Sequence, residues 1–247
     1  MLIHFSALRT TIIYRKLKHY YESIISARYS RRLTLRRILQ SAMISHVVDI
    51  GANIGQFGVD LREVGYKGSI YSFEPIPEAF LLLQKRASRD HDWSCFESAI
   101  GESNTKKLLK ISGNSGLSSS FLEMHPNHMV NFPSSKFVDQ VEVTVRKLDD
   151  VVSNMDIDFS STLMKIDAQG FEIEILKSFN HLKQIPLYLL EVSFKPLYEQ
   201  SPIFGDIIIF FDRFGYDVEA IHPSLISKTG EILQADLLFR NRDYKFD

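Results

Sequence analysis

The sequence predicts an α/β fold in which helices cover both faces of a mostly parallel sheet. From residue 46 onward, short β-rich runs alternate with helix-length amphipathic segments, and this alternation is typical of a parallel sheet. A glycine-containing turn, GANIG, directly follows the first of these runs. The chain has 247 residues, of which 45% are hydrophobic and 24% charged, as expected for a soluble globular protein. We expect one domain, spanning residues 46–247.

The expected strands and helices follow one another along this domain. Strands are expected at 46–51, 69–74, 93–100, 162–168 and 186–192, with helices at about 54–64, 77–87, 171–179 and 203–214. The segments 215–221 and 232–241 are expected to form a final antiparallel pair. Within 101–158, the runs KKLLKIS and QVEVTVR alternate in polarity and predict an inserted β-hairpin. The long polar connection between these two runs is typical of a functional or mobile loop.

Residues 1–45 are expected to form a basic helical cap. Apolar residues in 8–40 recur at helical spacing, and residues 1–40 carry nine lysines and arginines against the single acid Glu22. A helix packed on the domain with a solvated basic face is one interpretation. The alternative is weak association of basic residues 9–37 with an anionic membrane surface or a polyanionic substrate.

Composition argues against several other classes of protein. The net charge of −1 gives no general reason to expect a nucleic-acid partner. Cys95 is the only cysteine, so no intrachain disulfide can form and a reducing compartment is favoured. No apolar run reaches the ~18–20 residues that span a bilayer, and basic residues interrupt any secretory signal. We expect a cytoplasmic protein, at most peripheral at the membrane.

The stretch VVDIGANIGQFG predicts a ligand site at the carboxyl end of the first strand. Gly51 allows a sharp turn and leaves room for a ligand, and Gly55 allows the helix to start close to the sheet. Asn53 occupies the middle glycine of the dinucleotide fingerprint, which counts against a pyrophosphate. Asp49 would instead attract a cation. The candidate cofactor residues here are Asp49, Gly51, Ala52, Asn53 and Gly55.

The next two strands support a nucleoside ligand. Glu74 ends the second strand, where a carboxylate can accept hydrogen bonds from both ribose hydroxyls, although it can also cap the helix after Pro75. The small residues Ser98 and Ala99 end the third strand and leave space for an adenine ring. A nucleoside with a positively charged group and no phosphate is expected, and S-adenosylmethionine fits this description.

The stretch MKIDAQG is expected to be a fourth strand beside the first, which would place Asp167 near both methyl donor and acceptor. Lys165 lies on the same face and can partly compensate its charge. Asp167 is therefore a candidate general base. His125 and His128, in the long polar connection, are alternative bases if that segment closes over the site. No grouping of residues has convincing metal-ligand spacing, so we name no metal ligands and leave open whether a metal is required.

DIGANIGQFG, SFEPIPEAF, MKIDAQGFEIEILK and LLEVSFKPLYEQSPIF, in this order, resemble the FkbM family of S-adenosylmethionine-dependent methyltransferases. The resemblance implies a Rossmann-like class I methyltransferase fold, with a seven-stranded sheet whose last strand is antiparallel. It also implies O-methylation, typically of a sugar, glycan or polyketide hydroxyl. Glu191 matches the family's acid at the end of the fifth strand and is a further catalytic candidate. Gln169 departs from the family, since many relatives carry Glu there, and we assign it no role.

Two other classes compete with a methyltransferase. A nicotinamide-dependent oxidoreductase would use a similar sheet, but Asn53 in the glycine turn counts against it. A non-catalytic nucleoside-binding protein would keep the fold without the chemistry.

Overall fold

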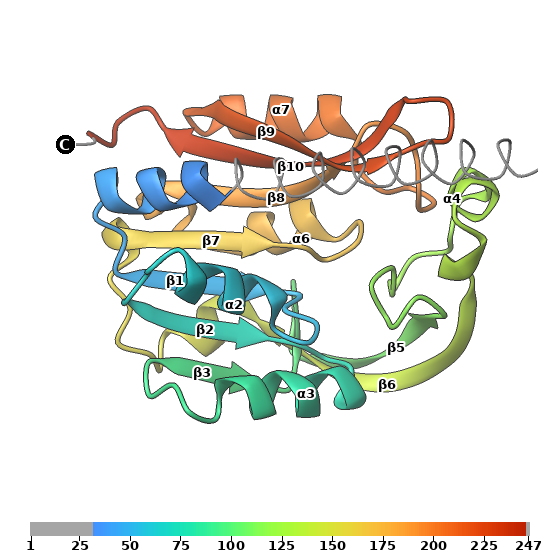
Figure 1. The fold of residues 1–247 in the computed structure, drawn as a ribbon, viewed down its shortest axis with the longest axis horizontal. Coiled ribbons are helices and arrows are strands. Elements are labelled where there is room, and N and C mark those ends of the chain that lie inside the picture. Colours follow the sequence, from blue (N-terminus) through green and yellow to red (C-terminus); the bar gives the residue numbers. More distant parts are fainter. Residues whose placement is uncertain (1–31, 246–247) are drawn as a thin grey trace, which may run out of the picture.

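The structure is a computed structural model that describes residues 32–245, and its centre is a seven-stranded sheet. The strand order is β3-β2-β1-β7-β8-β10-β9, and β10 runs antiparallel to both of its neighbours (Figure 1). The strands are β1 (His46–Ile50), β2 (Ser69–Phe73), β3 (Trp93–Phe96), β7 (Thr162–Ile166), β8 (Leu187–Ser193), β9 (Tyr216–Ile226) and β10 (Ile232–Asn241). The expected mostly parallel sheet with an antiparallel last strand is confirmed.

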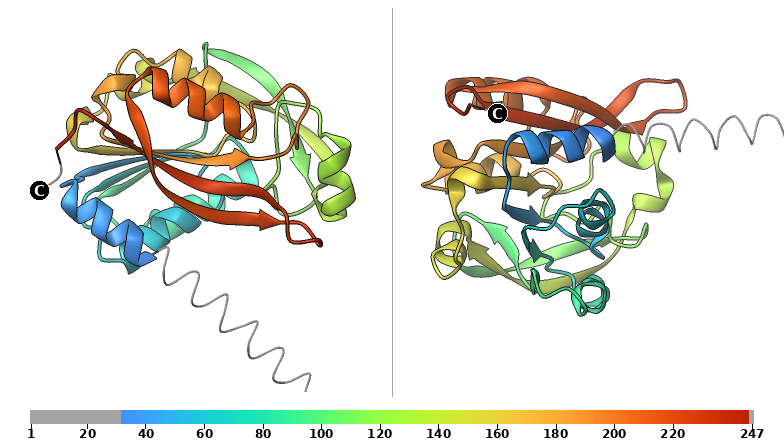
Figure 2. Two further views of the ribbon diagram at one scale, coloured as in Figure 1. Left: turned by 90° about the horizontal axis from the view of Figure 1, so that it is seen from above. Right: turned by 60° about the vertical axis from the view of Figure 1, so that its left-hand side comes forward.

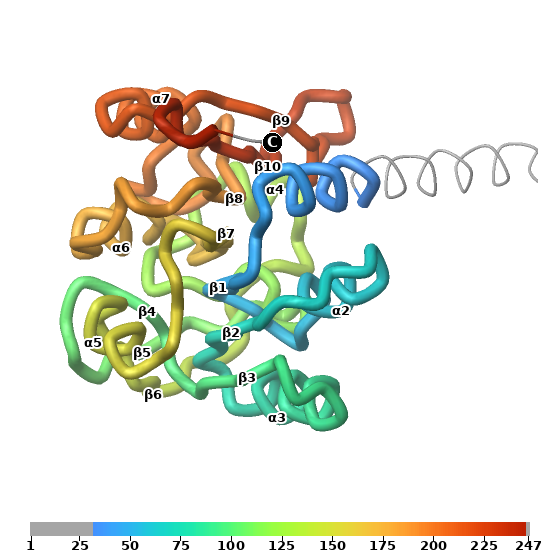
Figure 3. Tube along the Cα trace, turned by 90° about the vertical axis from the view of Figure 1, so that its left-hand side faces the viewer, coloured from blue at the N-terminus to red at the C-terminus, as the bar shows by residue number. Residues whose placement is uncertain are grey.

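Helices cover both faces of this sheet, as Figure 3 shows from one end. One face carries the helix of residues 32–41 together with α2 (Gln56–Glu63) and α3 (Pro77–Ala87). The other face carries α5 (Leu148–Val152), α6 (Glu172–Lys177) and α7 (Phe204–Arg213). Short 3₁₀ turns occur at Pro133–Ser135, Phe159–Ser161 and Leu182–Gln184.

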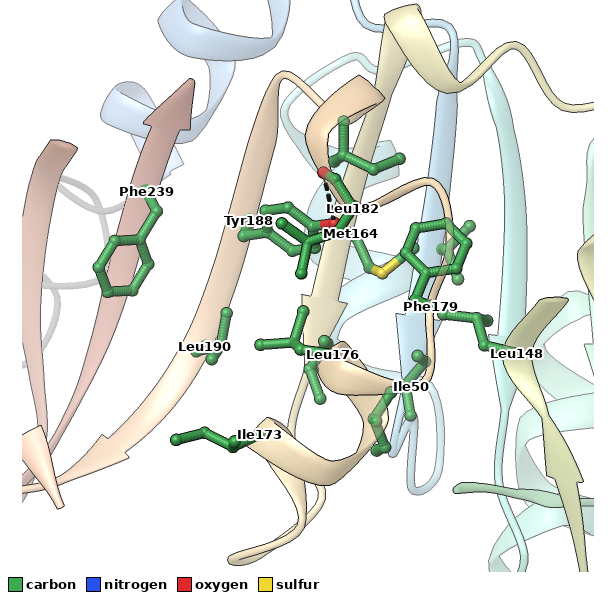
Figure 4. Close-up of a cluster of buried hydrophobic side chains, with 14 of the residues drawn as sticks. Ile50, Leu148, Met164, Ile173, Leu176, Phe179, Leu182, Tyr188, Leu190 and Phe239 are labelled. Atoms are coloured by element: carbon green, nitrogen blue, oxygen red, sulfur yellow. Dashed lines mark hydrogen bonds between the residues drawn. The ribbon is translucent and has the colours of Figure 1, made fainter. Parts of the chain in front are cut away.

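Buried apolar side chains fill the space between the sheet and each helical layer. Figure 4 shows part of the larger cluster, where Met164, Leu176 and Phe179 pack between β7 and α6. Tyr188 is fully buried there, and its hydroxyl donates to the carbonyl oxygen of Leu182 at 3.0 Å. Burying a large apolar side chain contributes about 1.5–3 kcal/mol. The sheet that carries the strand ends is therefore held firmly on both sides.

The expected insertion forms a smaller sheet beyond the carboxyl ends of β1, β2 and β7 (Figures 1 and 2). Its strands are β4 (Ala99–Gly101), β5 (Thr105–Ser112) and β6 (Phe137–Lys147), in the order β4-β6-β5. β5 and β6 are the predicted antiparallel hairpin, and α4 (Pro126–Asn131) lies in their connection.

The expected third strand is wrong in its length. Residues 93–100 do not form one strand, because β3 ends at Phe96 and β4 begins at Ala99. Glu97 and Ser98 form the corner where the chain leaves the large sheet for the small one. Their pairing partners differ on the two sides of the corner: β3 pairs with β2, whereas β4 pairs with β6.

The expected N-terminal cap is described only in part. Residues 1–31, and with them most of the predicted helix of 8–40, lie outside the described residues. Leu35 and Leu39, on the described helix, join the buried cluster that also contains Phe57 and Leu61 of α2. In residues 32–245, no helix combines the length and the apolar character that crossing a membrane requires.

Candidate functional site

The glycine turn after β1 is stabilised by bonds within the chain itself. The backbone N–H groups of Gly51 and Ala52 both donate to the carbonyl oxygen of Phe73, at 3.0 Å each. The N–H of Asn53 donates to Glu74 Oε2 at 2.7 Å, and that of Gly55 to the carbonyl of Ala52 at 2.8 Å. These four donors are thus used, whereas a dinucleotide turn offers its N–H groups to phosphate. The turn argues against a pyrophosphate-binding site.

Gly51 has a backbone requirement that excludes any larger residue. Its φ is +76°, and a Cβ built on it would overlap the backbone oxygen of Asp167. The ends of β1 and β7 therefore approach each other as closely as the backbone permits. This approach places the glycine turn directly beside Asp167, as the sequence predicted.

Glu74 is buried at the end of β2, with 3% of its surface exposed. Its two carboxylate oxygens accept the N–H groups of Asn53 and Ile76, the latter at 2.8 Å. Burial raises the pKa of Glu74 to about 7, although both backbone hydrogen bonds act in the opposite direction. Glu74 thus fixes the backbone at the start of the next helix, which is one of the two roles expected for it. It also lines a pocket, and its binding of a ribose there stays a prediction.

This first pocket lies where five segments meet, and it encloses about 680 Å³ of space, part of it open to solvent. Its lining comes from the ends of β1, β2 and β7, the corner after β3 with the following β4, and β5 with its connection to β6. The lining residues are Ile50, Gly51, Asn53, Glu74, Pro75, Ile76, Ser98, Ala99, Ile100, Leu109, Gly116, Leu117, Ser119, Phe121, Asp167, Ala168, Gln169 and Phe171. Most of the predicted cofactor residues thus share one cavity.

The other predicted cofactor residues lie beside this pocket. Asp49 is fully buried behind it, where Ser72 Oγ approaches its Oδ2 at 3.3 Å. Ala52 lines a second pocket, on the other side of the glycine turn. Gly55 lies against Leu83 and Trp93, at the start of α2, with a φ of +86°. Gly55 lines neither pocket, and its contacts agree with the expectation that it lets the helix start close to the sheet.

Lys165 and the two aspartates form a charge cluster between β1 and β7, in which Asp49 is fully buried and Asp167 is partly exposed. Lys165 Nζ lies 3.0 Å from Asp49 Oδ1 and 3.7 Å from Asp167 Oδ2, and it donates to the carbonyl of Gly51 at 3.2 Å. Burial by itself lowers the pKa of Lys165, but Asp49 and Asp167 more than offset this and raise it overall. Lys165 is therefore a permanent cation that holds the strand ends together.

Gln169, to which the sequence analysis assigns no role, lies at the centre of the site. Its Nε2 donates to Asp167 Oδ1 at 2.6 Å and to Glu191 Oε2 at 2.8 Å. Its Oε1 accepts a hydrogen bond from the Tyr198 hydroxyl at 2.7 Å. One neutral amide thus separates two carboxylates and orients both of them.

Glu191 is the acid at the end of β8, as the family resemblance implied. Burial, followed by the neighbouring Asp167 and Asp236, raises its pKa, while hydrogen bonds from Gln169 and Ser224 oppose the rise. Ser224 Oγ donates to Glu191 Oε1 at 3.1 Å. Glu191 therefore holds its proton to a higher pH than an ordinary carboxyl.

A second pocket adjoins the first at Gly51, Asn53, Leu117 and Asp167, and it encloses about 970 Å³ of space, part of it open to solvent. Its remaining lining comes from α2, the helix of 32–41 and the strand ends β7 to β10. These residues are Arg32, Leu35, Ala52, Gln56, Phe57, Asp60, Lys165, Glu191, Ser224 and Asp236. A molecule in each pocket would meet the other beside Asp167.

The predicted histidines lie elsewhere. His125 is the N-cap of α4, where its Nδ1 accepts the N–H of Asn127 at 3.2 Å, and it lines neither pocket. His128 is buried against Phe132 and Tyr198, and burial lowers its pKa. The connection itself does cover the first pocket, because Ser120 Oγ donates to the carbonyl of Gln169 at 2.7 Å. The segment is thus positioned as expected, but its histidines are not.

The first pocket fits S-adenosylmethionine. Phe121 and Phe171, whose ring centroids lie 5.5 Å apart, and Ile76 provide apolar walls for an adenine. Ser98 Oγ is buried and has no hydrogen-bond partner within residues 32–245, so it can serve a ligand. Glu74 and Asp167 suit ribose hydroxyls and a sulfonium. Within the same residues, no group of three or more His, Cys, Asp or Glu is arranged to hold a metal ion.

Comparison with known proteins identifies the family. A family model described as the methyltransferase FkbM domain matches residues 49–218, which is more than half of the chain. The chain belongs to the FkbM methyltransferase family. The matched region contains Asp49, Gly51, Glu74, Asp167 and Glu191.

Two curated methyltransferases are similar to this FkbM-family chain. Methyltransferase 1 of Beauveria bassiana is 27% identical over 150 residues, which cover 55% of this chain and 59% of that protein. The 2-O-methyltransferase NoeI of Sinorhizobium fredii is 24% identical over 202 residues, which cover 79% of each chain. The chain thus spans about three fifths of the Beauveria protein and about four fifths of NoeI.

Two solved methyltransferase structures resemble this chain at low sequence identity. M. capricolum TrmK, in complex with S-adenosyl-homocysteine, has a TM-score of 0.45 and 13% identity, covering 85% of this chain and 70% of that one. Magnesium protoporphyrin IX methyltransferase from Synechocystis, with bound S-adenosylmethionine, has a TM-score of 0.45 and 10% identity, covering 85% and 79%.

The FkbM assignment confirms the predicted family, which is a family of methyltransferases, and it agrees with the predicted cofactor, S-adenosylmethionine. The strand order of the structure independently agrees with the class I fold that the resemblance implied.

Proposed function

We propose that this FkbM-family protein transfers a methyl group from S-adenosylmethionine to a hydroxyl of a sugar, glycan or related natural product. The observation that carries the proposal is the meeting of two pockets at Asp167, one suited to the cofactor and one large enough for an acceptor. Similarity to a 2-O-methyltransferase supports transfer to oxygen. Methyl transfer needs little more than this alignment, since the methyl group is already activated by its sulfonium.

In the proposed reaction, the residues of the first pocket hold the cofactor. Glu74 binds the ribose, Ser98 and Ala99 lie along the adenine, and the carboxylates of Asp49 and Asp167 favour the positive sulfur. S-adenosylmethionine supplies a methyl group that an oxygen can attack in line with the departing sulfur. Apolar residues and the covering segment 113–121 exclude water from this contact.

Asp167 is the proposed general base. Its Oδ1 is occupied by the amide of Gln169, so Oδ2 is the atom that takes the acceptor's proton. Lys165 Nζ lies 3.7 Å from that oxygen and helps to fix the position of the carboxylate. Glu191 lies behind Gln169 and supports Asp167 through the shared amide.

The proposal is tested by binding and by transfer. Isothermal titration is expected to show binding of S-adenosyl-homocysteine and no comparable binding of NAD. Incubation with methyl-labelled cofactor and a panel of glycans is expected to give label that survives mild alkali, because methyl ethers are stable and methyl esters are not. Binding of the cofactor without transfer to any hydroxyl would favour the non-catalytic alternative, and tight binding of NAD would favour an oxidoreductase.

We also propose that basic residues 9–37 contact an anionic surface weakly. The support is their charge in the sequence, since residues 1–31 lie outside the described part of the structure. Co-sedimentation with anionic vesicles is expected for the full chain and to be reduced on removing residues 1–30. Equal sedimentation of the two forms would leave these residues as a helical cap.

A further inference from the structure

Among residues 32–245, two cations line the second pocket, and both are engaged by the protein's own oxygens. Arg32 forms ion pairs with Asp60 and Glu63 at the outer side of the pocket. Lys165, at the inner side, contacts Asp49 and Asp167 and donates to the carbonyl of Gly51. Neither cation is left without a counter-charge, because each one contacts two carboxylates.

The acids of the same pocket outnumber these cations even without Glu191, whose raised pKa favours the neutral form, because Asp60, Asp167 and Asp236 also line it. Glu191 and Asp236 lie opposite one another on the antiparallel strands β8 and β10, and both line the pocket together with Asp167. Each of the two lies within electrostatic range of Lys165 or Asp167: Asp236 acts on Lys165, and Asp167 acts on Glu191. One lysine is therefore shared among Asp49, Asp167 and Asp236.

This balance decides which acceptor chemistry the pocket can accommodate. Carboxylates accept hydrogen bonds, and hydroxyl groups can donate to them without bringing a charge. A phosphate, sulfate or carboxylate group would meet fixed negative charge, and the nearby cations are already paired. The exposed Ser224 and the amide of Gln56 add neutral polar groups at the rim.

We propose that the second pocket is the acceptor site and that it selects uncharged polyhydroxyl compounds, excluding acceptors that carry phosphate, sulfate or carboxylate near the methylated hydroxyl. This inference rests on the proposed function, because it takes the first pocket as the cofactor site. It adds a charge rule that family membership does not provide.

The test is a binding experiment on the full chain with S-adenosyl-homocysteine present. Saturation-transfer NMR would compare neutral methyl glycosides of several hexoses with the matching uronic acids, hexose 6-phosphates and amino sugars. We expect a saturation-transfer signal for the neutral glycosides. The matching uronic acids and hexose 6-phosphates are expected to bind more weakly, by roughly tenfold or more. Equal or tighter binding of the anions overturns the inference. Binding of amino sugars alone, or of no neutral glycoside, also overturns it.

A matched pair of variants locates the effect. Asp236→Asn and Glu102→Gln each remove one negative charge, but Glu102 is exposed and lines neither pocket. Asp236→Asn is expected to reduce the difference in binding affinity between neutral and anionic sugars. Glu102→Gln is expected to leave that difference unchanged. The same change in both variants, or in neither, overturns the assignment to this pocket. If Asp236→Asn does not fold, Ser224→Lys at the exposed rim provides the equivalent test by adding a cation.

The two proposals fail in different ways. Loss of S-adenosyl-homocysteine binding in the wild-type chain would refute the proposed function before any sugar is added. Retained cofactor binding with free acceptance of anionic sugars would refute the charge rule alone.

Discussion

Lys165 Nζ lies 3.0 Å from Asp49 Oδ1, and the two residues face each other on the adjacent parallel strands β7 and β1. This pairing explains how a buried strand end can carry so many charged residues. Asp49, which is fully buried, is compensated by Lys165 on the neighbouring strand, beside the first pocket. The same lysine reaches Asp167, which lines both the first and the second pocket.

Removing this lysine is expected to destabilise the fold. Lys165→Met leaves Asp49 buried without a cation, and breaking a buried pair costs about 3–5 kcal/mol. The double variant Asp49→Asn with Lys165→Met is expected to regain part of that loss. The free energy of unfolding in urea measures both. The exposed pair Lys106–Glu142 is the control, since Lys106→Met is expected to cost less than about 1 kcal/mol. Equal costs at the two sites would contradict this account.

Replacing Glu74 is expected to weaken cofactor binding. Glu74→Gln loses the charge that accepts ribose hydroxyls, and hydrogen bonds to charged groups contribute about 1.5–3 kcal/mol, or roughly 10- to 100-fold in affinity. Isothermal titration with S-adenosyl-homocysteine measures the loss. Glu78→Gln, an exposed change on α3 that removes the same charge, is expected to bind as the wild type does. Unchanged affinity in Glu74→Gln would remove Glu74 from the cofactor site.

Cofactor binding is also expected to depend on pH. Burial raises the pKa of Glu74 to about 7, so the free protein holds a proton there in mildly acidic solution. Ribose hydroxyls and a cation prefer the ionised carboxylate, so affinity is expected to rise between about pH 6 and 8 and then level off. Titrations across this range test the rise, and Glu74→Gln is expected to flatten it. A cofactor affinity that falls with rising pH would contradict the role given to ionised Glu74.

The stability of the free protein is expected to change in the opposite direction. A carboxyl whose pKa is raised by folding contributes stability that is present below its unfolded pKa of about 4.5 and is lost as the pH rises through about 7. Glu172, whose pKa burial also raises to about 7, adds to this loss. Urea denaturation without cofactor is therefore expected to show stability declining between about pH 4.5 and 7.

Asp167→Asn tests the proposed base. The amide keeps the size of the side chain but cannot take a proton at Oδ2, and general-base catalysis contributes typically about 10²- to 10⁴-fold. Turnover with an accepted glycan is expected to fall by about that factor, while the folded state persists in circular dichroism. Wild-type turnover in this variant would refute the role.

Gln169→Glu tests the neutral bridge between Asp167 and Glu191. The substitution removes the two N–H groups that Gln169 donates to Asp167 and Glu191. It also places a third carboxylate beside these two, and the repulsion among them is relieved only if they share a proton. The melting temperature is expected to fall below that of the wild type, and the difference to grow as the pH rises. Gln184→Glu, at an exposed turn, is the control and is expected to show little pH-dependent difference. A pH-independent loss in Gln169→Glu would point to a packing defect instead.

The sequence predicted the parts of the site that depend on strand ends. Glu74 and Asp167 follow recognisable apolar runs, and the carboxyl ends of neighbouring parallel strands necessarily meet at one edge. The corner at Glu97–Ser98 was missed, because an alternating run shows where a strand can form but not where it changes sheet. The partners of a strand depend on the whole fold.

Gln169 was missed for a related reason. Its amide reaches Asp167, Glu191 and Tyr198, which come from three separate parts of the chain. Its backbone φ of +49° directs the side chain there, and no pattern of polarity encodes that direction. The departure from Glu at this position was the available signal. A neutral residue in place of an acid fits a site already crowded with carboxylates.

The close approach of Gly51 to the backbone of Asp167 sets a boundary for protein engineering. A methyl group added at Gly51 would force apart the ends of β1 and β7, where we propose that donor and acceptor meet, so mutant libraries aimed at new acceptors are expected to lose their active members at that codon. Diversity is better directed to the outer wall, where Gln56 and Ser224 can change without moving either strand. The close contact at Gly51 thus tolerates no added atom, whereas the exposed side chains of the second pocket can be exchanged.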